Sequence, residues 1–368
     1  TAVSVCVRPQ QQQVVHSVRN AARNREQPLQ PPPRVPGDLE LAWTRRCPGA
    51  HRFGRSYQTR RGHLVETVAR AALYDSEGVK REETTVLNIF NDFDYNRSVI
   101  TIVATIDSIR EAVLSACQKA CELIDMPTHT GVHPCMGAVD LIPIYPLGEE
   151  VGVEDCAQEA RAVAQGLTER VRGTSVFLFG WADSPSRRGL AQRRKELGWF
   201  KKTPDLLAIR PDFGPQPLKR YGLTGVGASP YVMNCNVTID TQDIRIGHSI
   251  AAAIRESTPG GIPGLQVLAL PHEGAVEIAC NVESVTAPPP GQLTDQPWPS
   301  FSIDGQLYCH ASASLISTRV AELAVRWGVG LKGTALVGFT PHECRALAAL
   351  ALSRGVGEFW KEQHRIRM

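Results

Sequence analysis

The sequence predicts an α/β protein made of two consecutive units, each with a mixed β-sheet covered by helices. Strand-like runs rich in β-branched residues recur between residues 86 and 337, as is typical of buried or half-buried strands. Segments with apolar residues at helical spacing lie between these runs. The chain has 368 residues, more than a single hydrophobic core usually serves, so we expect two domains.

The composition is that of an ordinary globular protein. Apolar residues make up 42% of the chain and charged residues 21%, and the net charge of +3 is too small to indicate a partner. Because no apolar run approaches the ~20 residues of a membrane helix, we expect no membrane partner and a cytoplasmic protein. The ten cysteines are scattered without a CxxC pair, which favours reduced thiols over disulfides or structural zinc.

Residues 1–61 differ from the rest of the chain. They contain a glutamine run at 10–13, a proline cluster at 28–36 and only three acidic residues. Organelle transit peptides are also arginine-rich and acid-poor, but the prolines argue against the long amphipathic helix of such a peptide. We therefore expect a disordered or atypical N-terminal extension.

The first domain is expected at residues 62–229. Its elements, in chain order, are a helix at 64–73, strands at 86–90 and 99–104, a helix at 107–124 capped by Asp107, a strand at 138–145, a helix at 153–171 and a strand at 175–179. The order β-β-α-β-α-β indicates helices packed on a mixed sheet. A basic connecting region follows, with a short helix expected at 187–199.

The second domain is expected at residues 230–368. Its elements are a strand at 231–239, a helix at 243–255, strands at 265–270 and 275–282, a helix at 315–327, a strand at 334–337 and a final helix at 341–352. The order β-α-β-β-α-β is that of the ferredoxin-like fold. A proline-rich insert at 287–299 is expected to be a surface loop.

Two histidines stand on a loop that leads into a strand. Gly131 and Pro134 exclude a helix between His129 and His133, so both histidines are expected on a loop that ends at a rigid strand. Histidine titrates near neutrality and can move protons without a large pKa shift. For His129, a hydrogen-bonded structural role is equally compatible with the pattern.

A second polar loop joins the first two predicted strands. It contains Asp92, Asp94, Asn96 and Arg97. Such residues commonly satisfy the backbone of a turn. Alternatively, Arg97 is placed to hold a substrate carboxylate through its planar guanidinium, while Asp94 or Asn96 orients an amine. The adjacent Asn-Arg pair favours substrate binding.

Four motifs together resemble the glutamate formiminotransferase family, which includes the formiminotransferase part of formiminotransferase–cyclodeaminase. They are His129-Thr-Gly-Val-His133-Pro-Cys-Met-Gly-Ala-Val-Asp140, Asp92-Phe-Asp-Tyr-Asn-Arg97, Pro211-Asp-Phe-Gly-Pro215 and Thr224-Gly-Val-Gly-Ala228. The resemblance implies two ferredoxin-like subdomains whose sheets face a shared groove. It also implies transfer of a formimino group from N-formiminoglutamate to N5 of tetrahydrofolate, a step of histidine catabolism and one-carbon metabolism.

The resemblance also implies roles for individual residues. His133 is the expected catalytic proton shuttle, and the expected substrate-binding residues are Asp92, Asp94, Asn96, Arg97 and His129. The expected folate-binding segment comprises Gly214, Pro215, Gln216, Pro217, Leu218, Lys219, Arg220, Tyr221 and Gly222. Tetrahydrofolate is the expected co-substrate, no metal is expected, and the expected partners are small molecules, with a homodimer conceivable and no nucleic acid.

Three alternatives remain beside this hypothesis. The chain departs from the family at Cys135, where arginine is common, and at 54–58, where the family has the end of an opening strand, so a catalytically impaired folate-binding homologue is the main alternative. The basic region 187–220 could bind nucleic acid, but the predicted strands lack paired aromatic residues for stacking. A metal site at His129, His133 and Asp140 matches no standard zinc spacing.

Overall fold

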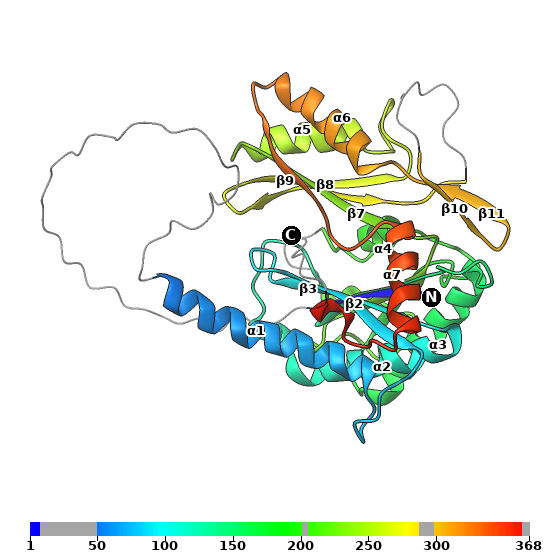
Figure 1. The fold of residues 1–368 in the computed structure, drawn as a ribbon. Helices are drawn as coiled ribbons and strands as arrows, with labels where there is room; N and C mark the ends of the chain where they lie inside the picture. The colour runs from blue at the N-terminus through cyan, green and yellow to red at the C-terminus, as the bar shows by residue number, and fades with distance from the viewer. Residues whose placement is uncertain (8–49, 201–204, 287–297, 363–368) are drawn as a thin grey trace, which may run out of the picture.

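The computed structural model describes residues 1–7, 50–200, 205–286 and 298–362. Within these ranges the chain forms two main sheets with helices on their outer faces, which confirms the α/β fold class (Figure 1). Helices α5 and α6 cover the second sheet on one side of the molecule, and α1, α2 and α3 cover the first sheet on the other. None of the described helices is both long and apolar enough to span a membrane.

The first sheet has six strands in the order β2-β3-β1-β4-β6-β5. The strands are β1 (Ala2–Val7), β2 (Thr84–Asp92), β3 (Arg97–Ala104), β4 (Val139–Tyr145), β5 (Val176–Gly180) and β6 (Thr224–Ala228). The first four are arranged as in a ferredoxin-like unit, with β1 antiparallel to both β3 and β4. Strands β6 and β5 extend this sheet in parallel beyond β4.

Strand β1 corrects the expectation for the N-terminal region. Residues 2–7 lie in the middle of the first sheet, and helix α1 (Ala50–Leu73) begins well before residue 62. The run Ala-Val-Ser-Val-Cys-Val has the alternating valines of a strand, but its partners β3 and β4 lie about a hundred residues or more further along the chain. Residues 8–49, the remainder of the expected extension, lie outside the described residues.

Helices α1, α2 (Ile106–Leu123) and α3 (Val153–Arg170) form the core of the first unit with their sheet. Val68, Val113 and Val163 of these helices are fully buried against strand residues such as Ile142. The N-cap of α2 is Thr105 rather than the predicted Asp107, which lies in the first turn. There its negative charge stabilises the helix through the macrodipole instead of through a capping hydrogen bond.

The second sheet has the predicted ferredoxin-like topology. Its strands are β7 (Met233–Ile239), β8 (Leu265–His272), β9 (Ala275–Val282) and β12 (Leu331–Leu336), and its helices are α5 (Ile244–Ile254) and α6 (Ala313–Val325). The strand order is β12-β7-β9-β8, with every pair antiparallel. A separate two-stranded sheet, β10 (Ser300–Ile303) and β11 (Gln306–Cys309), follows the insert, of which residues 287–297 lie outside the described ranges.

Two helices lie between the sheets (Figure 1). Helix α4 (Leu190–Glu196) is shorter than the predicted helix at 187–199, and α7 (Pro341–Ser353) begins at the predicted proline. Helix α7 belongs to the second half of the chain but packs on β2 and β3, where Ala348 joins Leu87 and Val103 in one cluster. The two halves of the chain therefore share buried surface.

Candidate active site

The candidate site lies at the edge of the first sheet where β3 and β4 begin. Because both strands run antiparallel to β1, their starting ends are at the same edge. The two polar loops identified in the sequence enter the sheet there, the turn at 92–97 before β3 and the loop at 124–138 before β4. Gly131 allows their close approach, because a Cβ on it would lie 2.8 Å from the carbonyl oxygen of Tyr95.

His133 is buried, with 8% of its surface exposed. Its Nδ1 lies 2.8 Å from the carbonyl oxygen of Pro134, and its Nε2 lies 3.0 Å from Nη1 of Arg97. A carbonyl only accepts and a guanidinium only donates hydrogen bonds, so these contacts assign the neutral imidazole with its proton on Nδ1. Nε2 is therefore the basic nitrogen, and it is directed at Arg97.

The turn at 92–97 is fixed from within and against the histidine loop. A carboxylate oxygen of Asp92 accepts a hydrogen bond from the backbone N–H of Tyr95 at 2.8 Å. Asn96 has a φ of +48°, which is uncommon for a residue other than glycine. Its side-chain amide donates to the carbonyl of Thr130 at 2.8 Å and lies 3.1 Å from Nδ1 of His129. Asn96 and His129 thus join the two loops.

Three buried polar atoms on the two loops and beside His133 have no hydrogen-bond partner among the residues that the structure describes: Nε of Arg97, Oδ1 of Asn96 and Nε1 of Trp199. Nearly all buried polar atoms of folded proteins are paired, so a cluster of unpaired ones calls for an explanation such as a ligand-binding role. Arg97 contacts His133 directly, and the ring of Trp199 lies edge-on, 5.7 Å from that of His133. The three atoms are candidates for hydrogen bonds to a substrate.

Aromatic rings enclose His133 on two sides. The ring centroid of Tyr95 lies 5.1 Å from that of His133, and Trp199 lies on another side. The guanidinium of Arg194 lies over the ring of Trp199, 4.3 Å from its centroid. The same guanidinium lies 3.9 Å from the buried carboxylate of Asp140. Trp199 was not among the predicted site residues, although a tryptophan directly after the basic helix was a usable signal.

The second subdomain supplies charged groups that the sequence analysis also missed. The hydroxyl of Tyr95 donates to Oε1 of Glu277 at 2.8 Å, and Asn236 donates to the same oxygen at 2.9 Å. Nε2 of His272 lies 3.0 Å from Oδ2 of Asp92. Glu277 alternates with the core residues Val276 and Ile278 in β9, a pattern that is typical of a solvent-facing position, so the sequence offered no local signal for it.

The three charged groups of this contact shift one another's pKa values. Burial lowers the pKa of His272, but the hydrogen bond to Asp92 and the charges of Glu277 and Asp92 outweigh burial and raise it to about 9. Burial raises the pKa of Asp92, but hydrogen bonds from His272 and the backbone of Tyr95 outweigh burial and hold it below its ordinary value. Burial raises the pKa of Glu277, against the opposing charge of His272. At neutral pH His272 is therefore a cation.

The remaining predicted residues lie around this centre. Asp94 is exposed and accepts a hydrogen bond from the backbone N–H of Glu273 at 2.6 Å. Cys135 is half-buried. The carboxylate of Asp140 accepts from the backbone N–H of Met136 at 2.7 Å, and thereby fixes the loop where it enters β4. Among the described residues, no group of three or more His, Cys, Asp and Glu side chains could hold a metal ion.

The predicted folate segment, residues 214–222, crosses the starting ends of β5, β6 and β4. At one end the hydroxyl of Ser175 donates to the carbonyl of Pro215 at 2.6 Å. At the other end the segment pairs with the histidine loop, where the carbonyl of Tyr221 accepts from the N–H of Ala138 at 2.9 Å and the N–H of Leu223, the next residue after the segment, donates to the carbonyl of Met136 at 2.8 Å. Arg220 donates to the carbonyl of Cys121 at the end of α2. The segment thus reaches the histidine loop at Met136, three residues beyond His133.

Several arginines of the basic connecting region are engaged in ion pairs. Arg188 pairs with Asp183 at 2.7 Å, and Arg193 pairs with Asp212 at 2.6 Å.

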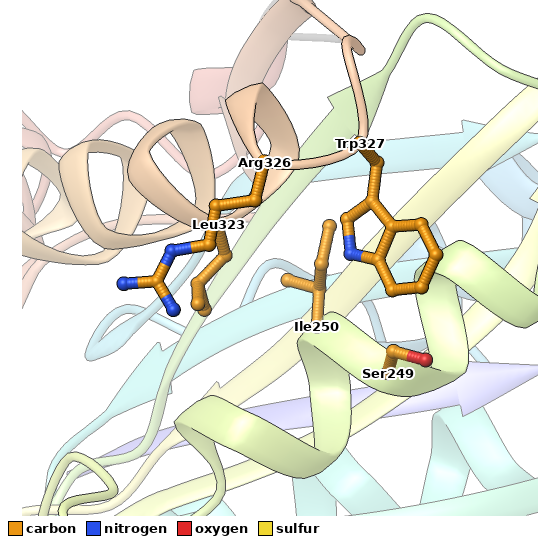
Figure 2. A pocket seen from close by; sticks show the side chains of 5 residues that line it. All are labelled: Ser249, Ile250, Leu323, Arg326 and Trp327. Carbon is orange, nitrogen blue, oxygen red and sulfur yellow. The ribbon is translucent and has the colours of Figure 1, made fainter.

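A separate cavity of about 300 Å³ lies between α5 and α6 on the second subdomain (Figure 2). It is lined by Ser249, Ile250, Leu323, Arg326 and Trp327. None of these residues belongs to the group around His133.

Comparison with known proteins gives consistent matches. Residues 57–229 match the family model for the formiminotransferase domain, N-terminal subdomain. The chain is 32% identical over 210 residues to a glutamate formimidoyltransferase of Thermoplasma acidophilum, a match that covers 55% of this chain and 68% of the relative. It is 36% identical over 181 residues to a glutamate formimidoyltransferase of Streptococcus pyogenes serotype M1, covering 48% and 59%. A formimidoyltransferase-cyclodeaminase of Gallus gallus is 33% identical over 208 residues, covering 54% of this chain and 38% of that protein.

Proposed function

This chain belongs to the formiminotransferase family, and we propose that it transfers a formimino group from N-formiminoglutamate to N5 of tetrahydrofolate. The relatives named glutamate formimidoyltransferase support a transferase of this type. The observation that carries the proposal is the neutral His133, buried with its basic Nε2 directed at Arg97. It combines a proton acceptor with a cation suited to a carboxylate substrate.

The reaction requires two proton transfers at neighbouring positions. N5 of tetrahydrofolate attacks the amidine carbon, a new C–N bond forms, and N5 must lose its proton. The bond between that carbon and the glutamate nitrogen then breaks, and the nitrogen must gain a proton to leave as an amine. A single imidazole can accept the first proton at Nε2 and return it to the leaving nitrogen, so that it is neutral again after each turnover.

Arg97 is proposed to bind a carboxylate of N-formiminoglutamate. One amino group of its guanidinium contacts His133, and its Nε is buried without a partner. When a carboxylate accepts from the planar guanidinium in a bidentate contact, Arg97 moves its hydrogen bond from Nε2 of His133 to the substrate. Substrate binding would then free the basic nitrogen at the moment when it is required. Asn96, with its unpartnered Oδ1, is proposed to orient the amidine N–H groups.

Residues 214–222 are proposed to hold tetrahydrofolate. The pairing of this segment with Met136 fixes it relative to His133. Lys219 is exposed and suited to the carboxylates of a folate tail, whereas Arg220 is already bound to the end of α2. The indole of Trp199, beside His133, offers an apolar surface and an unpaired N–H for the ring that presents N5.

The experiment is a turnover assay of the purified chain with both substrates, together with His133→Ala. We expect formation of glutamate by the wild-type protein and a rate lowered by ~100-fold or more in the variant. Turnover unaffected by His133→Ala would refute the role of His133. The impaired-homologue alternative predicts tetrahydrofolate binding in calorimetry without any transfer. The missing opening strand was one of the observations that motivate this alternative, and a strand is present in the first sheet as β1.

A further inference from the structure

The second subdomain places two charged residues against the candidate site that the proposed reaction does not use. His272 ends β8, and Glu277 lies in β9, so both belong to one hairpin. The tip of this hairpin lies against the turn at 92–97: His272 contacts Asp92 at 3.0 Å, Tyr95 contacts Glu277 at 2.8 Å, and the backbone of Glu273 donates to Asp94 at 2.6 Å. Three separate contacts therefore join the turn to the hairpin.

The two carboxylates of this contact have a cation between them only if His272 is protonated. The side chains of Asp92 and Glu277 are 6% and 7% exposed. His272 lies between them, with Nε2 at 3.0 Å from Asp92 and Nδ1 at 3.7 Å from Glu277. Carboxylates only accept hydrogen bonds, so both ring nitrogens face acceptors, and only the imidazolium has two donors. The ring of Tyr95, 4.7 Å away, and the carboxylate of Glu273 on the same turn complete its surroundings.

We propose, on the basis of the transferase function above, that His272 and Glu277 are positioning residues for the glutamate-binding side of the site. The imidazolium holds Asp92, and Glu277 holds the hydroxyl of Tyr95, so the turn is anchored at two points. Asn96 and Arg97 follow directly on this turn and contact the histidine loop and His133. The second subdomain thereby sets the position of the group that receives the substrate carboxylate.

The backbone of the turn gives a reason for such anchoring. Asn96 has a positive φ, a conformation that persists in a residue other than glycine only where the surroundings enforce it. Loss of the imidazolium removes the cation that lies between the two buried carboxylates of Asp92 and Glu277 and leaves Arg97 as their charged neighbour, which is unfavourable for the contact. The turn would then move away from Glu277 and take Arg97 with it. The folate segment meets the first subdomain at Ser175, Met136 and Cys121, so it is not held by these contacts.

The test uses His272→Gln and Glu277→Gln, with His248→Gln on the exposed face of α5 as the matched control. We expect the KM for N-formiminoglutamate to rise ~10-fold or more in both variants, and the KM for tetrahydrofolate to stay within ~2-fold. The control should leave both constants unchanged. A loss of folded protein alone would lower the apparent kcat without moving either KM. That result, or an equal rise of both KM values, would overturn the proposal.

The pH dependence provides a second readout. The wild-type KM for N-formiminoglutamate should rise as the pH passes about 9, where His272 loses its proton. The His272→Gln variant should lack this rise, because glutamine does not titrate. The same alkaline rise in the variant would show that another group is responsible and would contradict the assignment.

Failure of the proposed function would be recognised separately. If the wild-type protein gives no turnover with any of these substrates, the transferase function fails, and the anchoring contact is then examined by NMR of ¹⁵N-labelled histidine. The proposal expects His272 to carry protons on both nitrogens up to a pH of about 9 and expects the ring signals of His133 to shift in Glu277→Gln. A neutral His272 at pH 7, or unchanged His133 signals, would overturn it.

Discussion

The two subdomains share a frame but differ at equivalent positions. The order β1-α1-β2-β3-α2-β4 in the first corresponds to β7-α5-β8-β9-α6-β12 in the second, and the strands take matching places in the two sheets. The connection from α2 to β4 covers residues 124–138 and carries His129 and His133. Its counterpart from α6 to β12 covers only residues 326–330 and contains no histidine. The residues proposed for the chemistry lie where the connection is long.

The equivalent hairpins differ in the same way, and they contact each other. The turn between β2 and β3 carries Asn96 and Arg97, each with a buried polar atom that has no partner. The hairpin of β8 and β9 carries His272 and Glu277, which are engaged with the first turn. One copy of the frame thus offers unsatisfied groups to a ligand, and the other supplies the charges that hold them. The following experiments are directed at this division of roles.

The largest effect is expected at the histidine that has no counterpart in the second subdomain. His133→Ala should lower kcat by ~100-fold or more, because the proton shuttle is lost. His248→Ala, on the exposed face of α5, should leave the rate unchanged. Steady-state kinetics at saturating substrate measure both variants. If the two behave alike, the catalytic role would not belong to the first subdomain's loop.

Alanine substitutions of two glycines with nearly the same backbone conformation allow the packing around a turn to be compared between the two subdomains. Gly222 has a φ of +71° and Gly274 a φ of +72°. A Cβ at Gly222 would collide with the carbonyl oxygen of Met136 in the histidine loop, whereas a Cβ at Gly274 meets nothing within 4 Å. We expect Gly222→Ala to lower the free energy of unfolding by about 3 kcal/mol and Gly274→Ala by about 1 kcal/mol, the cost of the conformation alone. Urea denaturation measures both, and equal losses would mean that the collision is relieved cheaply.

The charge on His272 should make the contact between the hairpins dependent on pH. Its pKa of about 9 in the folded protein lies above the ordinary value of 6.5, so its stabilisation is complete below the ordinary value and is lost as the pH rises through about 9. We expect the free energy of unfolding of the wild-type protein to fall by about 2 kcal/mol between pH about 6 and about 9.5, relative to His272→Gln. Parallel denaturation curves at the two pH values measure this difference. If the difference in the free energy of unfolding between the two proteins is the same at both pH values, His272 is not the group that loses a proton in this range.

Arg97 tests whether the first turn recognises a carboxylate by shape or by charge alone. Arg97→Lys keeps the charge but loses the planar, bidentate donor. We expect the KM for N-formiminoglutamate to rise ~10-fold and kcat to change less, since His133 remains in place. An unchanged KM would indicate that another residue receives the carboxylate. The turn between β2 and β3 would then not be the part of the molecule that binds the substrate carboxylate.

The smallest effect is expected at an exposed ion pair that joins the C-terminal helix to the first subdomain. Arg345 of α7 lies 3.2 Å from Glu149, and both side chains are more than half exposed. Exposed pairs contribute little, so Arg345→Ala should change the free energy of unfolding by less than about 0.5 kcal/mol. A larger loss in thermal or urea unfolding would show that surface charge contributes to the joining of the halves.

The sequence was most informative where structure is local. Strand-like runs, helical periodicity and Pro341 predicted the elements of the second sheet and its helices, with the last strand beginning at 331 rather than 334, but they did not predict the hairpin of β10 and β11. The position of β1 was missed because its partners β3 and β4 are distant in the sequence. The motifs suggested His133 and Arg97 as parts of one site, and the structure brings them within 3.0 Å. Trp199 stands out in the sequence but comes beside His133 only in the fold, and no local pattern encodes the contacts of His272 and Glu277 with the first subdomain.

The return of the C-terminal segment to the first sheet has a consequence for synthesis on the ribosome. Strand β2 is at the edge of that sheet, where the backbone of Val86 donates to the carbonyl of Gly357, and the hydroxyl of Thr85 bonds to Val356, 271 residues away. While the chain emerges from its N-terminus, β2 stays an open edge and Leu87 stays uncovered by α7. Open edges invite pairing with other chains. A transcript truncated between the first subdomain and α7 would therefore release a polypeptide that is prone to aggregate, even though every residue around His133 from the first subdomain had been made.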